Sequence, residues 1–530
     1  MRSGRPDDES PPPQWVSSPW TPWAVFAVVA VLFCVYGVSR IDTYLVSGYD
    51  LGIFDQAVRH YSLFQAPIVT LKGDGYSIWA DHFHPIIAAW APLYWIWDDI
   101  RVLVIGQALV VAAAVFPLWA FLTRRLGRGV WPIVFVGATM LGWPIQCLID
   151  FDVHEIAFAV PLLAWVVESL DAHRDRTLLI ACPLLLLVRE DMGALVCVIG
   201  LVRLIWGRPT RAIRPADWRA GLALIVAGVT VFVVVTQVVI PAFAPQGFQY
   251  WDYPVLSATS GPGGILATAG HALADLVTPT VKIWTWLALL VPVGFLALAS
   301  PYALIAAPIM AERMLAAREP LWTTHFHYNA PVWMILCLAA VDGAERLWRR
   351  WGAHGRAAPQ ASPVHTTPDA TTRAPASTKV LTAWLAGCIT LGMAVSFSGL
   401  LPRVTEIFPL YRVVAGSAFR TSPQAESRAE VVAWLPADTC VAADDRVAGH
   451  LTHSNRVTVP GVSEHRQVFY VLDLSEPRPA TTDADWSTAH SLDVAEGLGF
   501  RQVFQAGSII VLQAPDYAGP DPLACGPTAP

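Results

Sequence analysis

The stretch 49–56, Tyr-Asp-Leu-Gly-Ile-Phe-Asp-Gln, follows the first apolar segment of the chain and contains two carboxylates, Asp50 and Asp55. On an ideal helix, residues five apart point about 140° away from each other, so the two acids need not share a face. A carboxylate beside a low-dielectric cavity can serve as a general base, because burial raises its pKa toward neutrality. We therefore predict that Asp50 is the catalytic base and that Asp55 supports it. The alternative is a pair of solvated loop acids.

A second group combines an acid with two histidines, at Asp81-His82-Phe83-His84. In an extended segment His82 and His84 lie on the same face. Asp81 could orient one imidazole or join it in binding a metal. The pattern indicates a metal or phosphate site, and ordinary hydrogen bonding at a membrane interface explains it equally well.

The densest group is Asp150-Phe151-Asp152-Val153-His154-Glu155, with four ionisable side chains in six residues. Carboxylate oxygens suit a hard cation such as Mg²⁺ or Mn²⁺, and histidine adds a possible Zn²⁺ ligand. We predict that Asp152, His154 and Glu155, with the two histidines of the second group, hold a divalent metal, and that Asp150 lies in the same pocket. The alternative is a helix start, in which Asp152 is the N-cap and Glu155 completes a capping box.

The triplet Arg189-Glu190-Asp191 interrupts an apolar run that extends from position 177 to 206. One helix of about 30 residues could cross a membrane with the triplet buried. The loops at both ends of the run are basic, which instead favours a hairpin with the triplet at its outer tip. Arg189 could bind a donor phosphate through its planar fork, with Glu190 or Asp191 balancing the charge. A purely structural ion-pair cluster is the alternative.

A last group comprises Glu312-Arg313 and a second His-x-His pattern, His325-Phe326-His327. Arg313 or Arg318 could neutralise a pyrophosphate or phosphate leaving group. The two histidines repeat the chemistry of His82 and His84. We place all of them in the same pocket as the earlier groups.

The segments that position these groups have the composition of a membrane protein. The chain has 530 residues, of which 55% are hydrophobic and only 14% are charged, far fewer charges than in a soluble globular domain. Repeated apolar runs between short charged islands indicate a polytopic protein, and nothing resembles a nucleic-acid-binding patch. About eleven transmembrane helices are expected, at 22–39, 101–123, 130–149, 154–170, 177–189, 191–206, 219–241, 282–299, 301–316, 328–347 and 380–401.

Lys and Arg in the short loops set the orientation. With the N-terminus inside and eleven crossings, all the basic loops fall inside, and the outer loop 40–100 and every candidate group fall outside. Residues 1–21 are expected to be a disordered cytoplasmic tail before a retained first span, and 22–348 a polytopic membrane domain. The range 349–379 reads as a flexible cytoplasmic linker. Residues 85–97 are too few to span, so we expect an interfacial helix with Trp90, Trp95 and Trp97 at headgroup level.

The composition changes after the last span, and 402–530 is predicted to be an extracytoplasmic α/β domain and tail. Five β-like runs are expected at 439–442, 456–459, 468–472, 501–504 and 509–512, with a helix at 425–434. The loop Gly449–His453 reads as a surface loop, with a ligand loop as the alternative. Cys440 and Cys525 could form a disulfide bond if the domain is extracytoplasmic.

The chain resembles a bacterial family of predicted membrane proteins whose shared domain has no known function. The matching residues are Tyr49–Gln56, Asp81–Pro85, Phe151–Glu155, Arg189–Asp191, Leu435–Asp438 and Gly449–Leu451. More distantly, its layout is similar to that of the type-C glycosyltransferases (GT-C), polytopic enzymes that use lipid-phosphate sugar donors. That resemblance implies a first-loop catalytic acid, which Asp50 matches, although Leu51 stands where the family's second acid is usual.

These observations together predict a plasma-membrane protein with a GT-C-like bundle of about eleven helices. The expected activity is transfer of a sugar from a polyprenyl-phosphate donor to an extracytoplasmic cell-envelope acceptor, a glycan or a protein. The expected partners are thus the lipid bilayer, the lipid-linked sugar and the acceptor, and the expected cofactor is Mg²⁺ or Mn²⁺. A transporter would instead show repeat symmetry and polar residues toward both faces. A non-catalytic scaffold for envelope assembly is the third possibility.

Overall fold

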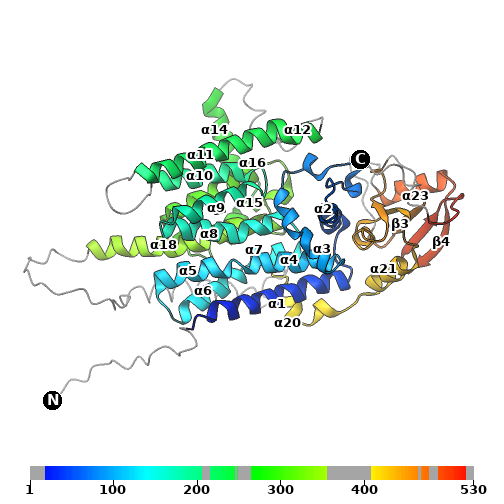
Figure 1. Ribbon diagram of the computed structural model, residues 1–530, viewed down its shortest axis with the longest axis horizontal. Coiled ribbons are helices and arrows are strands. Elements are labelled where there is room, and N and C mark those ends of the chain that lie inside the picture. Colours follow the sequence, from blue (N-terminus) through cyan, green and yellow to red (C-terminus); the bar gives the residue numbers. More distant parts are fainter. Residues whose placement is uncertain are drawn as a thin grey trace, which may run out of the picture.

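The computed structural model describes residues 18–205, 215–244, 247–248, 264–354, 408–463, 467–476 and 487–520. Along its long axis the protein consists of a helical bundle and a smaller α/β domain, with the loop 40–100 between them (Figure 1). The predicted last span at 380–401 and Cys525 lie outside the described residues, as do most of the predicted N-terminal tail and linker.

The bundle forms because apolar runs fold into helices that bury their side chains in one large cluster. Its helices are α1 (Thr21–Asp42), α4 (Arg101–Ala112), α5 (Val115–Leu126), α6 (Val130–Met140), α7 (Trp143–Asp150), α8 (Ala159–Asp171), α9 (Asp175–Leu186), α10 (Met192–Ile205), α11 (Pro215–Val234), α12 (Ile240–Phe243), α14 (Gly264–Asp275), α15 (Val281–Leu290), α16 (Ala307–Leu315), α17 (Glu319–Trp322) and α18 (Ala330–His354).

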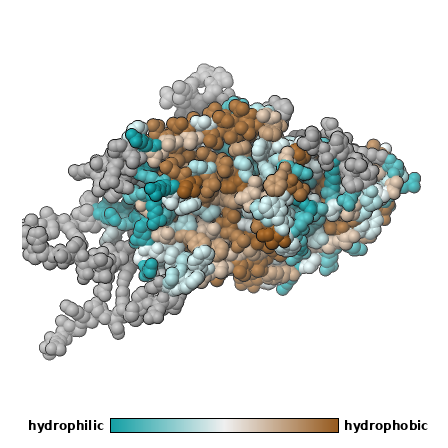
Figure 2. Space-filling model, viewed as in Figure 1, coloured by the Kyte–Doolittle hydropathy of each residue, from teal (hydrophilic) through white to brown (hydrophobic). Residues whose placement is uncertain are grey.

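The bundle has the apolar surface of a multi-pass membrane protein. In Figure 2 a broad hydrophobic band covers its middle, with hydrophilic residues toward both ends. Within the described ranges, three helical stretches are long and apolar enough to cross a membrane, at Thr21–Asp42, Arg101–Leu126 and Trp218–Phe243. The bent pair α6 and α7, which meet at 45°, counts as a fourth if the two helices form one broken span. Helices occupy the ten predicted ranges that are described, but the number of eleven crossings is not confirmed.

The apolar run containing Arg189–Asp191 is broken as predicted. Helix α9 ends at Leu186 and α10 begins at Met192, so the triplet lies in a turn between two helices. A single continuous helix is therefore excluded. The capping-box interpretation of Asp152 is wrong, because the N-cap of the following helical turn is His154 and Asp152 binds elsewhere.

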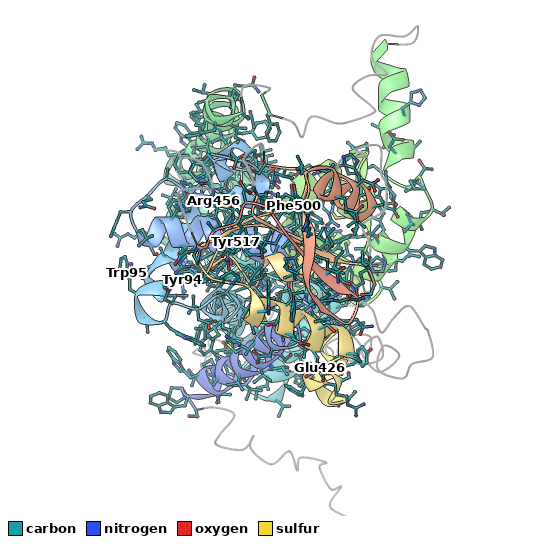
Figure 3. All side chains as sticks on the ribbon, turned by 90° about the vertical axis from the view of Figure 1, so that its right-hand side faces the viewer. Tyr94, Trp95, Glu426, Arg456, Phe500 and Tyr517 are labelled. Carbon is teal, nitrogen blue, oxygen red and sulfur yellow. The ribbon has the colours of Figure 1, made fainter. Side chains whose placement is uncertain are left out.

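The loop 40–100 contains a π-helical turn at Gly48–Gly52, followed by α2 (Ile53–Ser62) and the short helices η5 (Pro85–Trp90) and α3 (Ala91–Ile96). Trp95 is 60% exposed and lies at the periphery of the end-on view in Figure 3, as expected for an interfacial side chain. Trp90 does not share that position. It is buried and packs against Phe158, so its ring does not face lipid headgroups.

The C-terminal domain holds a five-stranded sheet of order β2-β1-β3-β5-β4. Strands β1 (Cys440–Ala443), β2 (Arg456–Thr458) and β3 (Phe469–Asp473) are parallel, whereas β5 (Ile509–Gln513) is antiparallel to both β3 and β4 (Arg501–Ala506). The helices are α20 (Tyr411–Val414), α21 (Pro423–Trp434), α22 (Asp445–Ala448) and α23 (Thr488–Gly497). All five predicted β-runs overlap these strands, which confirms the small α/β domain. Cys440 is disulfide-bonded.

The C-terminal domain and the loop 40–100 share one hydrophobic cluster. It includes Leu51 and Phe54 of the loop together with Val447, Leu451 and Val457 of the domain. The two parts therefore fold against each other. The prediction of a surface loop at Gly449–His453 is wrong, since most of that loop is buried in this contact.

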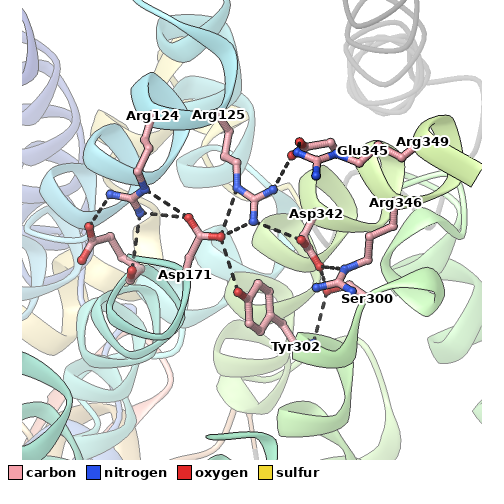
Figure 4. A network of polar contacts seen from close by, with 10 residues as sticks. Arg124, Arg125, Asp171, Ser300, Tyr302, Asp342, Glu345, Arg346 and Arg349 are labelled. Carbon is pink, nitrogen blue, oxygen red and sulfur yellow. Dashed lines mark hydrogen bonds and ion pairs between the residues drawn. The ribbon is translucent and has the colours of Figure 1, made fainter. Parts of the chain in front are cut away.

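The far end of the bundle carries a network of ion pairs (Figure 4). Arg124 and Arg125 from α5 both bind Asp171 at the end of α8, and Arg125 also binds Asp342 of α18 at 3.1 Å. Ser300 donates a hydrogen bond of 2.6 Å to the same Asp342. These contacts tie α5, α8 and α18 together at the end opposite the C-terminal domain.

Candidate functional site

A cavity of about 550 Å³ opens where the bundle meets the loop 40–100. Its walls come from the π-helical turn, the segments before η5 and after α7, the α9–α10 turn, α16 and the segment before α18. Ten of the sequence-predicted site residues line it, namely Asp50, Asp81, His82, His84, His154, Glu155, Arg189, Glu190, Asp191 and His327. Groups spread over 278 positions of sequence thus meet in one space, because the bundle brings the ends of their helices together.

Asp50 faces His154 across this cavity. Its Oδ1 lies 3.4 Å from Nε2 of His154, and the Asp50 side chain is 30% exposed. The other ring nitrogen, Nδ1, donates to the carbonyl of Phe151 at 2.9 Å. Because Nδ1 carries that hydrogen, Nε2 is the atom that can accept a proton beside Asp50.

The position of His154 is fixed by two neighbours. The buried amide of Gln107 in α4 accepts a hydrogen bond from the His154 backbone N–H at 2.8 Å and donates to the carbonyl of Asp152. The imidazole of His154 stacks on that of His327, with ring centroids 3.9 Å apart. Gln107, on the transmembrane stretch Arg101–Leu126, therefore holds the loop that carries His154.

Arg189 is held as a fork against Asp191, with Nε 2.8 Å from Oδ1 and Nη2 2.6 Å from Oδ2. Nη1 lies 3.6 Å from Glu155, beyond hydrogen-bond distance, and keeps a donor for another anion. Glu312 of α16 adds a second carboxyl group beside Asp191. The α9–α10 turn thus presents one oriented guanidinium to the cavity.

The two histidines of the Asp81 group differ in environment. Nδ1 of His82 donates to Glu190 at 2.6 Å. Burial alone lowers the pKa of His82, but the charge and hydrogen bond of Glu190 outweigh it and raise the pKa above its usual value. His84 has no such partner, and burial lowers its pKa. His84 is therefore the weaker base of the two histidines.

Lys72 is a cavity residue that the sequence did not reveal. It pairs with Asp81, and its ammonium lies 5.7 Å from the centre of the Tyr49 ring. Lys72 lies in a stretch without helical or strand periodicity, so no pattern pointed to it. Asp81 thus forms an ion pair with Lys72, and its predicted role in orienting a histidine stays a prediction.

Five predicted residues, Asp55, Asp150, Asp152, Arg313 and His325, do not line the cavity. Asp55 is buried against the C-terminal domain, and His325 is exposed. Arg40 binds Asp150 and Asp152 at 2.8 Å each, so both acids anchor α1. The guanidinium of Arg313 donates to the carbonyls of Leu321 and Tyr328 and to the side chain of Asn329, so backbone anchoring occupies it.

The predicted metal ligands do not form a ready cation site. Asp152 is occupied by Arg40 and by the N–H of Ser47, while Glu155 lies next to Arg189. Within the described ranges, no three His, Cys, Asp or Glu side chains are grouped to hold a metal ion. Among the described residues that line the cavity, the Nδ1 atoms of His84 and His327 are buried without a hydrogen-bond partner. Metal binding remains a prediction.

No curated protein matches the chain. Among solved structures, the chain is similar to ArnT from Cupriavidus metallidurans bound to undecaprenyl phosphate, with a TM-score of 0.50 and 16% sequence identity. That likeness covers 95% of this chain and 100% of the ArnT chain. The apo state of the same protein gives a TM-score of 0.50 over 96% of this chain. At this identity the likeness shows a common fold, the GT-C fold expected from the sequence.

A family model, described as "Predicted membrane protein (DUF2079)", matches residues 40–479. The match spans most of the chain, and it includes the π-helical turn, the cavity and much of the C-terminal domain. The chain therefore belongs to the DUF2079 family of membrane proteins.

Proposed function

We propose that this protein is a membrane glycosyltransferase, which moves a sugar from a polyprenyl-phosphate donor to an acceptor in the cell envelope. The observation that carries the proposal is the joint presence of Asp50 and Arg189 in one cavity of a GT-C fold. The similar ArnT structure was solved with undecaprenyl phosphate, a donor carrier of the proposed class. The cavity and the C-terminal domain would face the extracytoplasmic side.

The cavity supplies a carboxylate to accept the acceptor's proton and a cation to stabilise the departing phosphate, both of which such a transfer needs. The acceptor hydroxyl oxygen forms a bond to the anomeric carbon of the donor sugar, and the hydroxyl proton passes to Asp50. His154, 3.4 Å away, lies where it can take the proton onward. The bond between the anomeric carbon and the phosphate oxygen breaks, and its electron pair stays on the phosphate.

Arg189 stabilises the negative charge that develops on the departing phosphate, and Lys72 adds a second cation in the same cavity. Asp191 orients the guanidinium of Arg189, so its free edge is fixed before the donor binds. Such preorganised charges are worth more in a low-dielectric cavity than in water. No step is routed through a metal ion, because two of the predicted ligands, Asp152 and His82, are already bound to Arg40 and Glu190.

The opposite end of the bundle offers less support for a transporter. Polar residues are present there, but Asp171 and Asp342 are each paired with arginines and only 4% and 2% exposed. Ser300 and Tyr302 provide further hydrogen bonds to these two acids. The network is therefore a closed structural contact between helices.

The decisive experiment is turnover of polyprenyl-phosphate sugars, labelled in the sugar, by the purified full-length protein in lipid nanodiscs. Asp50→Asn should lower the turnover number by about 100-fold or more, because the acceptor proton loses its base. Asp42→Asn is the matched control, since Asp42 is an exposed acid outside the cavity.

Full turnover by Asp50→Asn would exclude the assignment of the base. No turnover by the wild type with any donor, in EDTA or in Mg²⁺ or Mn²⁺, would favour a transporter or an assembly scaffold. Turnover that requires added metal would revive the predicted cation site.

A further inference from the structure

The turn that carries Asp50 is in direct contact with the C-terminal domain. The backbone N–H of Tyr49 donates a hydrogen bond of 2.8 Å to Oδ1 of Asp445, the first residue of α22. Tyr49 immediately precedes Asp50 in the chain. A residue almost 400 positions away therefore binds the peptide unit next to the proposed base.

The two segments approach each other with no room for a side chain. A Cβ atom on Gly48 would lie 2.7 Å from Cβ of Ala448 and 3.1 Å from the carbonyl oxygen of Asp445. A Cβ atom on Gly52 would lie 2.8 Å from Leu71 and 3.3 Å from Thr452. Glycines at both ends of the π-helical turn thus allow the C-terminal domain to pack against its backbone.

The same turn is held from the bundle side. Asp152, itself bound to Arg40, accepts the N–H of Ser47 at 2.7 Å, and Oγ of Ser47 accepts the N–H of Tyr49 at 3.1 Å. The carboxylate of Asp445 accepts a second hydrogen bond from the same Tyr49 N–H. The turn is therefore clamped between a carboxylate of the membrane domain and a carboxylate of the C-terminal domain.

Asp445 is also within electrostatic reach of Asp50. Burial raises the pKa of Asp445, and the negative charge of Asp50 raises it further, while hydrogen bonds from Ser47 and Tyr49 lower it. By contrast, no residue of the C-terminal domain lines the cavity, among the residues that the structure describes. Among the described residues, an effect of this domain on the chemistry would therefore act through the loop 40–100, in which the turn carries Asp50.

We infer that Asp445 is a positioning residue, which holds the turn Gly48–Gly52 so that Asp50 faces the cavity, and that the C-terminal domain thereby forms part of the transfer machinery. The inference rests on the proposed function. Displacement of a catalytic group by about 1 Å can cost up to about 100-fold in rate.

The test compares Asp445→Ala with Asp445→Asn in the full-length protein in nanodiscs. Asp445→Ala removes the shorter of the two hydrogen bonds from the Tyr49 N–H and should lower kcat by about 10-fold, with the KM for the donor unchanged. Asp445→Asn keeps an acceptor oxygen and should retain most of kcat. Asp493→Ala is the matched control, because Asp493 is an exposed acid on α23 of the same domain.

Wild-type kcat in Asp445→Ala would overturn the inference, and so would an equal loss in Asp445→Asn. If Asp445→Ala does not fold, Asp445→Glu replaces it. The additional methylene group displaces the carboxylate from the Tyr49 N–H, so kcat should fall, and wild-type kcat would again overturn the inference.

Hydrogen exchange of the peptide containing Tyr49 separates this inference from the proposed function. The Tyr49 amide should exchange at least about 10-fold faster in Asp445→Ala than in the wild type or Asp445→Asn, because the shorter of its two hydrogen bonds is lost and only the one to Oγ of Ser47 remains. If the wild type shows no turnover at all, the proposed function fails while this measurement still decides whether Asp445 holds the turn. Equal exchange in all three proteins would overturn the inference.

Discussion

His453 of the C-terminal domain and Asp55 of the loop 40–100 form a hydrogen bond of 2.7 Å between Nε2 and Oδ1, although 398 positions separate them. The hydroxyl of Tyr94 donates to the same oxygen. Asp55 is 0% exposed and its Oδ2 has no partner within the described ranges. Asp55 therefore links the loop 40–100 to the C-terminal domain, and of the two acids in the stretch 49–56 only Asp50 lines the cavity.

Substitution of Asp55 should loosen the contact between the two domains. Asp55→Ala leaves His453 and Tyr94 without their buried partner, which should lower the free energy of unfolding by about 3 kcal/mol. The thermal unfolding temperature of the protein in nanodiscs measures this change. Asp55→Asn keeps an acceptor for Tyr94 and should lose less. If Asp55→Ala, His453→Ala and the double variant all lose the same free energy of unfolding, the two residues act as a unit.

Stability should fall in acid because of His450. Burial, together with the positive charges of Arg101 and Arg428, lowers the pKa of His450 to about 4. The unfolded chain binds the same proton with a pKa of about 6.5, so unfolding is favoured as the pH falls from about 6.5 to 4. The loss amounts to about 3 kcal/mol at most.

The control for this effect is His450→Phe, which keeps an aromatic ring against Tyr44, whose ring centroid lies 3.9 Å from that of His450. Unfolding temperatures at pH 7, 5.5 and 4.5 should drop less in His450→Phe than in the wild type. Parallel pH profiles in the two proteins would contradict the assignment.

Two arginines near the cavity should respond differently to replacement by lysine. Arg189→Lys loses the fork to Asp191 and the oriented donor, so donor turnover should fall by about 10-fold or more while the protein remains folded. Arg313→Lys loses contacts to two carbonyls and Asn329, so stability should fall while turnover per folded molecule is kept. The reverse pattern would move the phosphate site to Arg313.

The orientation of the C-terminal domain can be tested by labelling in intact cells. A cysteine in place of the exposed Glu426 of α21 (Figure 3) should react with a membrane-impermeant maleimide. A cysteine in place of Arg128, exposed at the opposite end of the bundle, should react only after permeabilisation. If only Arg128→Cys reacts in intact cells, the orientation of the protein in the membrane is the reverse of the one predicted.

The sequence by itself determined the class of the protein and most of its local structure. Apolar runs can be stable only as buried or membrane-embedded helices, so the bundle could be predicted, and alternating runs gave the five strands of the C-terminal sheet. Acids, histidines and Arg189 at the edges of apolar segments are costly unless they face a cavity or a partner. That rule found most of the cavity, including Asp50 and the α9–α10 turn.

Only the tertiary structure decided which ionisable residues are chemical and which are structural. Asp50 and Asp55 look equivalent in the chain, but Asp55 meets His453, a contact that depends on how the C-terminal domain packs. Asp152 likewise finds its partner, Arg40, through the packing of a helix 112 positions away, and Arg313 is bound by the segment that leads into α18. The residue pattern within a short stretch cannot predict such pairs, because hydrogen bonds form between residues that are neighbours in space. The turn bearing Asp50 is positioned by Asp445 for the same reason.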